Sequence, residues 1–143
     1  MRAFCAIYTA WAYSQGFFRQ DGHKLLGLSP HKEMANALAQ RFVPQDPNDL
    51  LIRTRAWQNA NISDHPLYNG DLKAAIKGIT AKAVVMPSST DQHFWSDDNR
   101  DEVEVMTNAE FKEIPSIWGH VAPSGSDAEA RIFMDDAIRE LIR

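Results

Sequence analysis

The second half of the sequence predicts an α/β fold, in which a few parallel strands alternate with helices, and the first half predicts a helical region. From residue 71 onward the pattern runs helix, strand, helix, strand, helix, which is typical of parallel strands joined by crossover helices. Before residue 62, apolar residues recur at three- and four-residue spacings, as they do along helices. The 143 residues suit one domain, but two strands alone do not form a stable open sheet.

Three helices are expected in the first sixty residues. Residues 2–19 have the spacing of one aromatic-rich amphipathic helix. Ser29-Pro30 offers an N-cap followed by a proline at a first helical position, and this start signal precedes a helix with an apolar face. That face consists of Met34, Leu38 and Phe42. Asp46-Pro47 repeats the start signal and predicts a helix that continues through Trp57.

The elements of the second half are predicted from turn residues and apolar runs. Asp71 can cap a short helix that carries Leu72 and Ile76. Residues 81–86 form an apolar run ended by Pro87, which predicts a strand buried on both faces. The remaining predicted elements are a helix at 97–106, a strand at 111–114, and a helix from Ser126 or Asp127 to Arg143.

Composition excludes several classes of partner. The net charge is −4 and no block of Lys or Arg stands out, so neither nucleic acid nor an anionic membrane is an expected partner. No run approaches the roughly 20 apolar residues of a membrane-spanning helix. Cys5 is the single cysteine, so an internal disulfide cannot form. The default prediction is a cytoplasmic protein.

The candidate catalytic residues are Asp91 and His120. Asp91 lies a few residues past the first predicted strand, and His120 lies a few residues past the second. Because parallel strands end at the same edge of a sheet, the two side chains are expected to open onto that edge together. Gly119 lets the loop turn tightly in front of the imidazole. The structural alternative, a capping aspartate and an unrelated loop histidine, stays open at this point.

The order acid, then histidine, is the second half of the Ser, Asp, His order of α/β-hydrolases. The first half would be a Gly-x-Ser-x-Gly turn, and none occurs in these residues. Cys5 could act as a nucleophile, but it falls within a predicted helix, where a buried small hydrophobe is the expected role. Ser124 and Ser126 follow the histidine in the chain, which makes them poor candidates as well.

Metal binding is not predicted. His93 could be combined with Asp97 or Asp98, but no paired Cys or His-x-x-x-His spacing accompanies them. The other histidines are expected to have structural roles, a turn at His65 and the surface at the two remaining positions, His23 and His31. Aromatic residues could line an apolar acyl pocket, although their helical spacing favours the core for most of them. These aromatic residues are Tyr8, Trp11, Tyr13, Trp57 and Trp118.

Several collinear motifs carry a resemblance to a known family. The motifs are Trp57-Gln58-Asn59-Ala60-Asn61-Ile62-Ser63, Pro66-Leu67-Tyr68-Asn69-Gly70-Asp71, Met86-Pro87-Ser88-Ser89-Thr90-Asp91 and Pro115-Ser116-Ile117-Trp118-Gly119-His120. Together they resemble the C-terminal part of the homoserine O-acetyltransferase-like family of α/β-hydrolase-fold proteins. Residues 2–15 resemble the start of that family's helical lid.

This resemblance implies a fold and a mechanism. The chain would be the C-terminal portion of an α/β-hydrolase fold, with a helical lid-like region at 1–62 and part of the core at 63–143. Asp91 matches the acid and His120 the base of a Ser-Asp-His triad. In the family that triad transfers an acyl group from acetyl-CoA to a small-molecule alcohol, or to water in hydrolytic relatives. No bound cofactor is implied.

The resemblance also has two departures. The nucleophile elbow and the oxyanion-hole loop of the family have no counterpart here, so the chain alone is expected to be inactive. Its implied partners are a second copy bound through the lid helices or a complementing N-terminal polypeptide. The alternative is a non-catalytic association module, in which the lid helices serve association and Asp91 and His120 are inert. Residues 121–124 (Val-Ala-Pro-Ser) differ from the family's usual continuation after the histidine, which leaves the acyl acceptor open.

Overall fold

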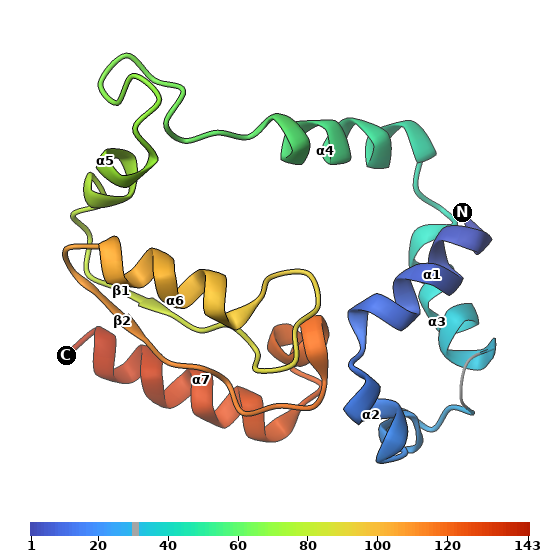
Figure 1. Cartoon of the computed structure of the whole chain (residues 1–143). Helices are drawn as coiled ribbons and strands as arrows, with labels where there is room; N and C mark the ends of the chain where they lie inside the picture. Colours follow the sequence, from blue (N-terminus) through green and yellow to red (C-terminus); the bar gives the residue numbers. More distant parts are fainter. Residues whose placement is uncertain (30–31) are drawn as a thin grey trace.

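The computed structural model describes residues 1–29 and 32–143 (Figure 1). Its first part is helical, as predicted, and consists of α1 (Arg2–Ala12), α2 (Gln15–Arg19), the 3₁₀ helix η1 (Gly22–Leu26), α3 (Lys32–Phe42) and α4 (Pro47–Asn59). Asp46 caps α4 as expected, because its carboxylate accepts a hydrogen bond from the Asn48 N–H at 2.8 Å. The predictions for Pro30 and His31 lie outside the described residues.

The second part alternates helices and strands. It consists of α5 (Leu72–Lys77), β1 (Ala83–Val85), α6 (Ser96–Val105), β2 (Ala109–Phe111), the 3₁₀ helix η2 (Gly119–Ser124) and α7 (Ala128–Leu141). Asp71 caps α5, and the predicted start of the last helix resolves to Asp127, which caps α7. The expected α/β order is confirmed.

The two strands are parallel and lie between α6 and α7 (Figure 1). Ala83 pairs with Ala109 and Val85 with Phe111. The pairing extends past both strands, since the Ile114 N–H donates to the Pro87 carbonyl at 2.8 Å. The two chain segments therefore run side by side up to the loops that carry the candidate catalytic residues.

Two strand predictions need correction. The strand expected at 81–86 is shorter, and all three of its residues are half-buried instead of buried on both faces. Its single sheet neighbour among the described residues is β2, so one edge and part of each face lack cover. The strand expected at 111–114 begins two residues earlier, at Ala109.

The helix expected at 2–19 is also wrong, because it breaks after Ala12. Ser14 starts a new helix, and its hydroxyl accepts a hydrogen bond from the Phe17 N–H at 3.0 Å. The same hydroxyl donates to the carbonyl of Ile117, more than a hundred residues away in the sequence. This long-range bond joins the helical first part to the loop before His120.

Ser14→Ala is expected to lower the free energy of unfolding by about 2–3 kcal/mol, since it removes a helix cap and leaves the Ile117 carbonyl without its donor. Urea unfolding measures this loss. Asp46→Ala is the matched control, because Asp46 caps the exposed helix α4 and should cost about 1 kcal/mol. Equal losses in the two variants would contradict the role given to the long-range bond.

The core is shared between the two parts of the chain. Its buried side chains come from α2, α3, the segment 112–118 between β2 and η2, η2 itself and α7, and they are Phe17, Met34, Ile114, Trp118, Ala122 and Ala130. Phe17 and Trp118 meet edge to face, with ring centroids 5.0 Å apart. Residues of the predicted lid-like region thus support the loop that carries His120. The predicted boundary at residue 62 stays a prediction.

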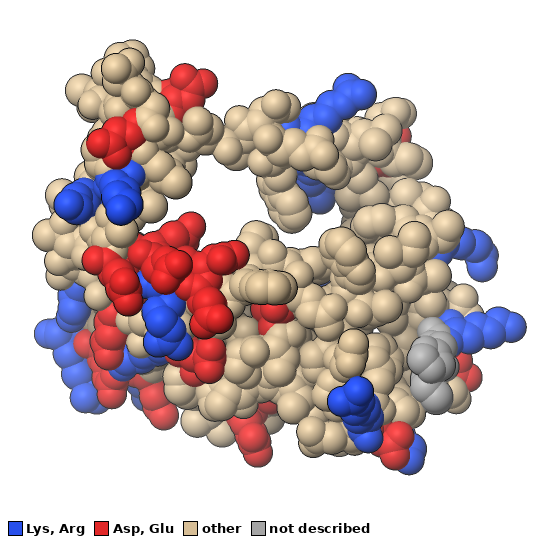
Figure 2. All heavy atoms as spheres, in the orientation of Figure 1, with Lys and Arg blue, Asp and Glu red and all other residues tan. Residues whose placement is uncertain are grey.

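The segment around α4 arches away from the rest of the chain and leaves an opening (Figures 1 and 2). None of its helical residues is buried, and Leu51, Ile52 and Trp57 are more than half exposed. Figure 2 also shows acidic side chains gathered over α6, where Asp97 and Asp98 occupy the first turn and suit the positive end of the helix dipole. No helix in the described part of the chain is long and apolar enough to cross a membrane.

Candidate active site

Asp91 lies in the loop that follows β1, and backbone groups hold its carboxylate. Oδ1 accepts hydrogen bonds from the N–H groups of His93, at 2.7 Å, and Phe94, at 3.3 Å. The side chain is only 8% exposed. With one oxygen bound by the backbone, Oδ2 is left to face the histidine loop.

Hydrogen bonds of Thr90 join the loop of His120 to the loop of Asp91. Its hydroxyl donates to the Ser116 carbonyl at 2.7 Å and accepts from the Gly119 N–H at 3.0 Å. Gly119 has a φ of +66°, and a Cβ at this position would lie 2.9 Å from the Ala12 carbonyl oxygen. The loop therefore needs glycine both for its left-handed backbone and for its close approach to the end of α1.

The structure brings Asp91 and His120 together. Nδ1 of His120 lies 3.0 Å from Oδ2 of Asp91, although the residues are 29 positions apart. A carboxylate can only accept, so Nδ1 carries the proton and donates. Nε2 has no hydrogen-bond partner within residues 1–29 and 32–143, and the imidazole is 27% exposed. The ring is thus oriented with a basic nitrogen free to exchange a proton.

His93 forms a wall of the site, a role that the sequence did not reveal. Its ring meets the His120 ring edge to face with centroids 4.4 Å apart, and it stacks on Tyr8 at 5.4 Å. Burial lowers the pKa of His93, and the nearby His120 lowers it further, while Asp91 acts in the opposite direction. Burial and the Asp91 charge raise the pKa of Tyr8, against the effect of Arg41.

The His93 ring is therefore expected to titrate below its ordinary value of 6.5. Because the unfolded chain then binds the proton more readily than the folded one, His93 contributes stability above about pH 6.5 that is lost as the pH falls. NMR titration of the ring protons measures the pKa, and His93→Gln should remove this part of the pH dependence of unfolding. A folded-state pKa at or above 6.5 would contradict the assignment.

An apolar cavity of about 440 Å³ opens beside His120. Its lining comes from α1, α4 and the Asp91 loop and includes Ile7, Tyr8, Trp11, Trp57, His93 and Phe94. Trp11 is 58% and Trp57 73% exposed, so the expectation that most aromatics lie in the core is wrong for these two. Trp118 and Tyr13 do pack at the core, whereas Tyr8 lines the cavity.

A second cavity, of about 230 Å³, lies on another side of His120 and is lined by Ser88, Asp91, Phe94 and Asn99 among others. Ser88 is 2% exposed, and its hydroxyl has no hydrogen-bond partner among the described residues. The sequence did not single out Ser88, because a lone serine at a strand end carries no pattern. A buried hydroxyl in this state is a place where a further polar group would fit.

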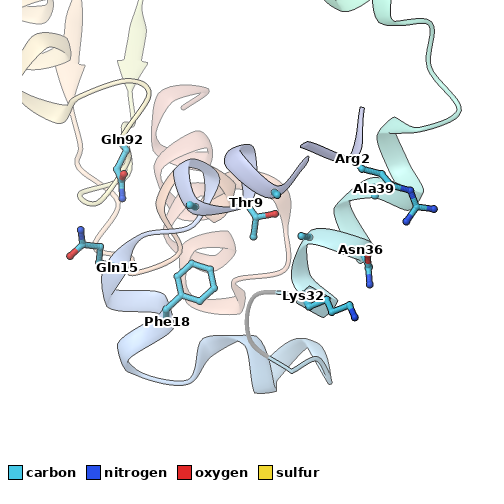
Figure 3. A pocket seen from close by; sticks show the side chains of 11 residues that line it. Arg2, Thr9, Gln15, Phe18, Lys32, Asn36, Ala39 and Gln92 are labelled. Carbon is cyan, nitrogen blue, oxygen red and sulfur yellow. The ribbon is translucent and has the colours of Figure 1, made fainter. Parts of the chain in front are cut away.

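The largest of these cavities, about 590 Å³, lies between α1 and α3 (Figure 3). Thr9 and Phe18 line it together with small residues, and Arg2 and Lys32 stand at its rim. Neither Asp91 nor His120 lines it, whereas His120 lines both smaller cavities and Asp91 lines the one of about 230 Å³. Gln92 lines both this cavity and the one beside His120.

The other residues considered from the sequence lie outside the site, and one of them is buried where the surface was expected. Cys5 is fully buried, as expected of a small hydrophobe, and Ser124 and Ser126 are exposed without a described hydrogen bond to His120. His65 serves a turn, as predicted, by accepting the Leu67 N–H. His23 was expected at the surface but is 4% exposed, because η1 folds it inward.

Comparison with known proteins identifies relatives of this chain, although no family model matches it. An ethyl acetate hydrolase of Pseudomonas veronii is 37% identical over 137 residues, which are 95% of this chain and 39% of that protein. A probable esterase of Corynebacterium glutamicum is 34% identical over 116 residues, 80% of this chain and 33% of that protein. The chain thus spans about two fifths or less of these relatives.

Two solved structures are similar to this chain over almost its whole length. The acetyl esterase MekB superposes with a TM-score of 0.91 at 35% identity, over 98% of this chain and 40% of that one. The chain has the fold of the C-terminal portion of an α/β-hydrolase. An acetylester hydrolase from Corynebacterium glutamicum gives the same TM-score at 31% identity and covers the same shares. The predicted α/β-hydrolase fold is confirmed, and these relatives are ester hydrolases rather than homoserine O-acetyltransferases.

Proposed function

We propose that this chain supplies the acid and the base of a Ser-Asp-His ester hydrolase that acts on small acetate esters. The observation that carries the proposal is the 3.0 Å contact between Asp91 and His120, which leaves Nε2 free beside an apolar cavity. The names of the relatives, an ethyl acetate hydrolase and acetyl esterases, favour esters as the substrate class.

In the proposed mechanism His120 moves the protons and Asp91 orients it. Nε2 takes the proton of a serine hydroxyl as that oxygen attacks the ester carbonyl, and then gives it to the departing alcohol. Water attacks the resulting acyl-enzyme in the same way and releases the carboxylic acid. Asp91 keeps the proton on Nδ1 and stabilises the imidazolium that forms in each step.

The nucleophile and the oxyanion-hole donors of this mechanism come from residues that are not in this sequence, because no Gly-x-Ser-x-Gly turn occurs in it. Three features support a further segment packed against the chain. The strand β1 is half-buried, the apolar side chains of α4 are exposed, and the buried hydroxyl of Ser88 has no partner among the described residues. Uncovered apolar surface of this kind marks an interaction surface.

The acyl acceptor in this proposal is water. The same triad would transfer an acetyl group from acetyl-CoA to homoserine if the site bound that alcohol instead, as the resemblance to the homoserine O-acetyltransferase-like family implies. The lining of the cavity beside His120 is dominated by aromatic and aliphatic side chains, which suit an apolar ester better than an amino acid. Product analysis separates the two reactions.

A chimera tests the proposal. The part of the Pseudomonas veronii hydrolase that lies outside the matched segment is fused to this chain, and hydrolysis of ethyl acetate is followed by release of acetate. The chimera is expected to hydrolyse the ester, and the 143-residue chain alone is expected to show the buffer rate. With acetyl-CoA and homoserine, no O-acetylhomoserine should form.

Three results would overturn the proposal. Ester hydrolysis by the isolated chain that depends on His120 would show that it holds its own nucleophile. A folded chimera without ester hydrolysis would show that Asp91 and His120 do not serve as acid and base for esters. Acetyl transfer to homoserine at a rate above ester hydrolysis would assign the site to the acyltransferase reaction.

A further inference from the structure

We infer that Asp91, His93 and His120 form a binding site for a divalent transition metal of the Zn²⁺ type, and that the metal competes with the acid–base pairing of His120. One ligand atom from each of the three side chains lies within 4.8 Å of those of the other two. Two imidazoles and one carboxylate are a donor set that zinc accepts in proteins. Binding at this site does not depend on the proposed function, whereas inhibition rests on it.

The geometry brings the three donors close without further folding. Nδ1 of His120 and Oδ2 of Asp91 are already 3.0 Å apart, and the two imidazole rings are 4.4 Å apart. Ligand atoms around tetrahedral zinc lie roughly 3.4 Å from one another, given bonds of about 2.0–2.2 Å. The widest spacing in the cluster therefore has to close by little more than about 1 Å, which rotation of the side chains supplies.

The surroundings hold the donors in place. The Asp91 carboxylate is fixed by the His93 N–H at 2.7 Å, so the second histidine is tied to the acid through the backbone. Tyr8 stacks on the His93 ring, and the Trp11 ring lies beside the His93 ring with their centroids 5.8 Å apart. Supporting contacts of this kind orient metal ligands and keep the loss of side-chain entropy on binding small. His93 and His120 both line the apolar cavity of about 440 Å³, so the metal can enter from that cavity.

Metal binding would disable the pair because the same atoms serve both purposes. Asp91 would share its carboxylate charge with the cation, and His120 would donate a lone pair to it instead of exchanging a proton. General base catalysis needs a protonated Nδ1 and a free lone pair on Nε2 of His120, and the metal complex does not have both. Zn²⁺ binding at the cluster would therefore lower the fraction of molecules in which His120 can act as the base.

Isothermal titration of the 143-residue protein with Zn²⁺ tests the site directly. One Zn²⁺ per chain is expected to bind with a Kd well below about 1 mM. His93→Phe keeps an aromatic ring against Tyr8 but removes the ligand nitrogen, and it should weaken binding by at least about tenfold. Circular dichroism confirms that the variant is folded.

Two controls address the other places where a cation could bind. The double change Asp97→Asn and Asp98→Asn removes acidic groups from the first turn of α6, and His65→Gln removes a histidine from an exposed turn. Neither should alter the affinity. In the unmodified protein, Co²⁺ should shift the NMR signals of the His93 and His120 rings and leave His65 unshifted.

Zn²⁺ binding that is unchanged in His93→Phe, or Co²⁺ shifts confined to other histidines, would overturn the site. In the active chimera, Zn²⁺ should inhibit ester hydrolysis, and His93→Phe should raise the inhibitory concentration at least about tenfold. A chimera that binds Zn²⁺ but never hydrolyses esters would refute the proposed function while leaving the metal site standing. Activity that persists with Zn²⁺ bound would refute the competition.

Discussion

His120→Ala in the chimera is expected to lower the rate of ester hydrolysis by about 10⁶-fold, which leaves only the residual activity that the rest of the site supplies. The loss is large because the nucleophile and the base act as one unit, so a serine without a base is hardly better than no serine. Rates of acetate release from ethyl acetate measure it. His65→Ala removes a histidine from an exposed turn and should leave the rate unchanged.

Asp91→Asn should cost less, about 10⁴-fold, because it keeps the shape of the side chain but no longer enforces the tautomer with the proton on Nδ1. The hydrogen bonds that hold Oδ1 to the backbone can persist in this variant, so folding should be preserved. A loss smaller than about tenfold in both variants would show that another group takes the serine proton.

Gly119→Ala is expected to give the largest loss of stability among single changes in this loop, about 2–5 kcal/mol. The residue has a φ of +66°, where a Cβ is strained, and that Cβ would lie 2.9 Å from both the Ala12 carbonyl oxygen and the Ser14 N. Both contacts are backbone atoms, which cannot rotate away. Urea unfolding measures the change.

Gly125→Ala is the matched control for Gly119→Ala. Gly125 also has a left-handed backbone, with a φ of +89°, but a Cβ at this position would have no neighbouring atom within 4 Å. Its substitution should cost only the conformational part, about 1–2 kcal/mol. Equal losses at the two glycines would show that the end of α1 moves aside without cost, and would contradict a rigid contact between α1 and the His120 loop.

Helix starts were predictable because their signals are local. Asp46, Asp71 and Asp127 each accept a hydrogen bond from a backbone N–H two or three residues later, and this geometry depends on neighbouring residues alone. The Asp91 and His120 pair was predictable for a different reason. Both follow parallel strands, and parallel strands deliver their following loops to one edge of a sheet.

Features that depend on distant partners could not be predicted. The hydrogen bond from the Ser14 hydroxyl to the Ile117 carbonyl is one of these features, because the chain brings the two residues together only on folding. The same holds for the placement of His93 against His120, because the ring contacts Tyr8 and Trp11 from the first helix. Helical spacing assigned Trp11 and Trp57 to a core, since spacing reports which face is apolar and not what covers it.

The assignment to an α/β-hydrolase fold came from the resemblance of several collinear motifs. Three further features were predicted from the residues directly: the order of helices and strands in the second half of the chain, the caps that start its helices, and the two residues whose loops meet. These follow from local hydrogen bonding and from the direction of parallel strands. Three features are visible only in the folded protein: the cavity that the imidazole of His120 lines, the position of His93 beside Asp91 and His120, and the burial of Ser88 without a partner among the described residues. Those features arise where segments far apart in the chain pack together, and no short stretch of sequence encodes such contacts.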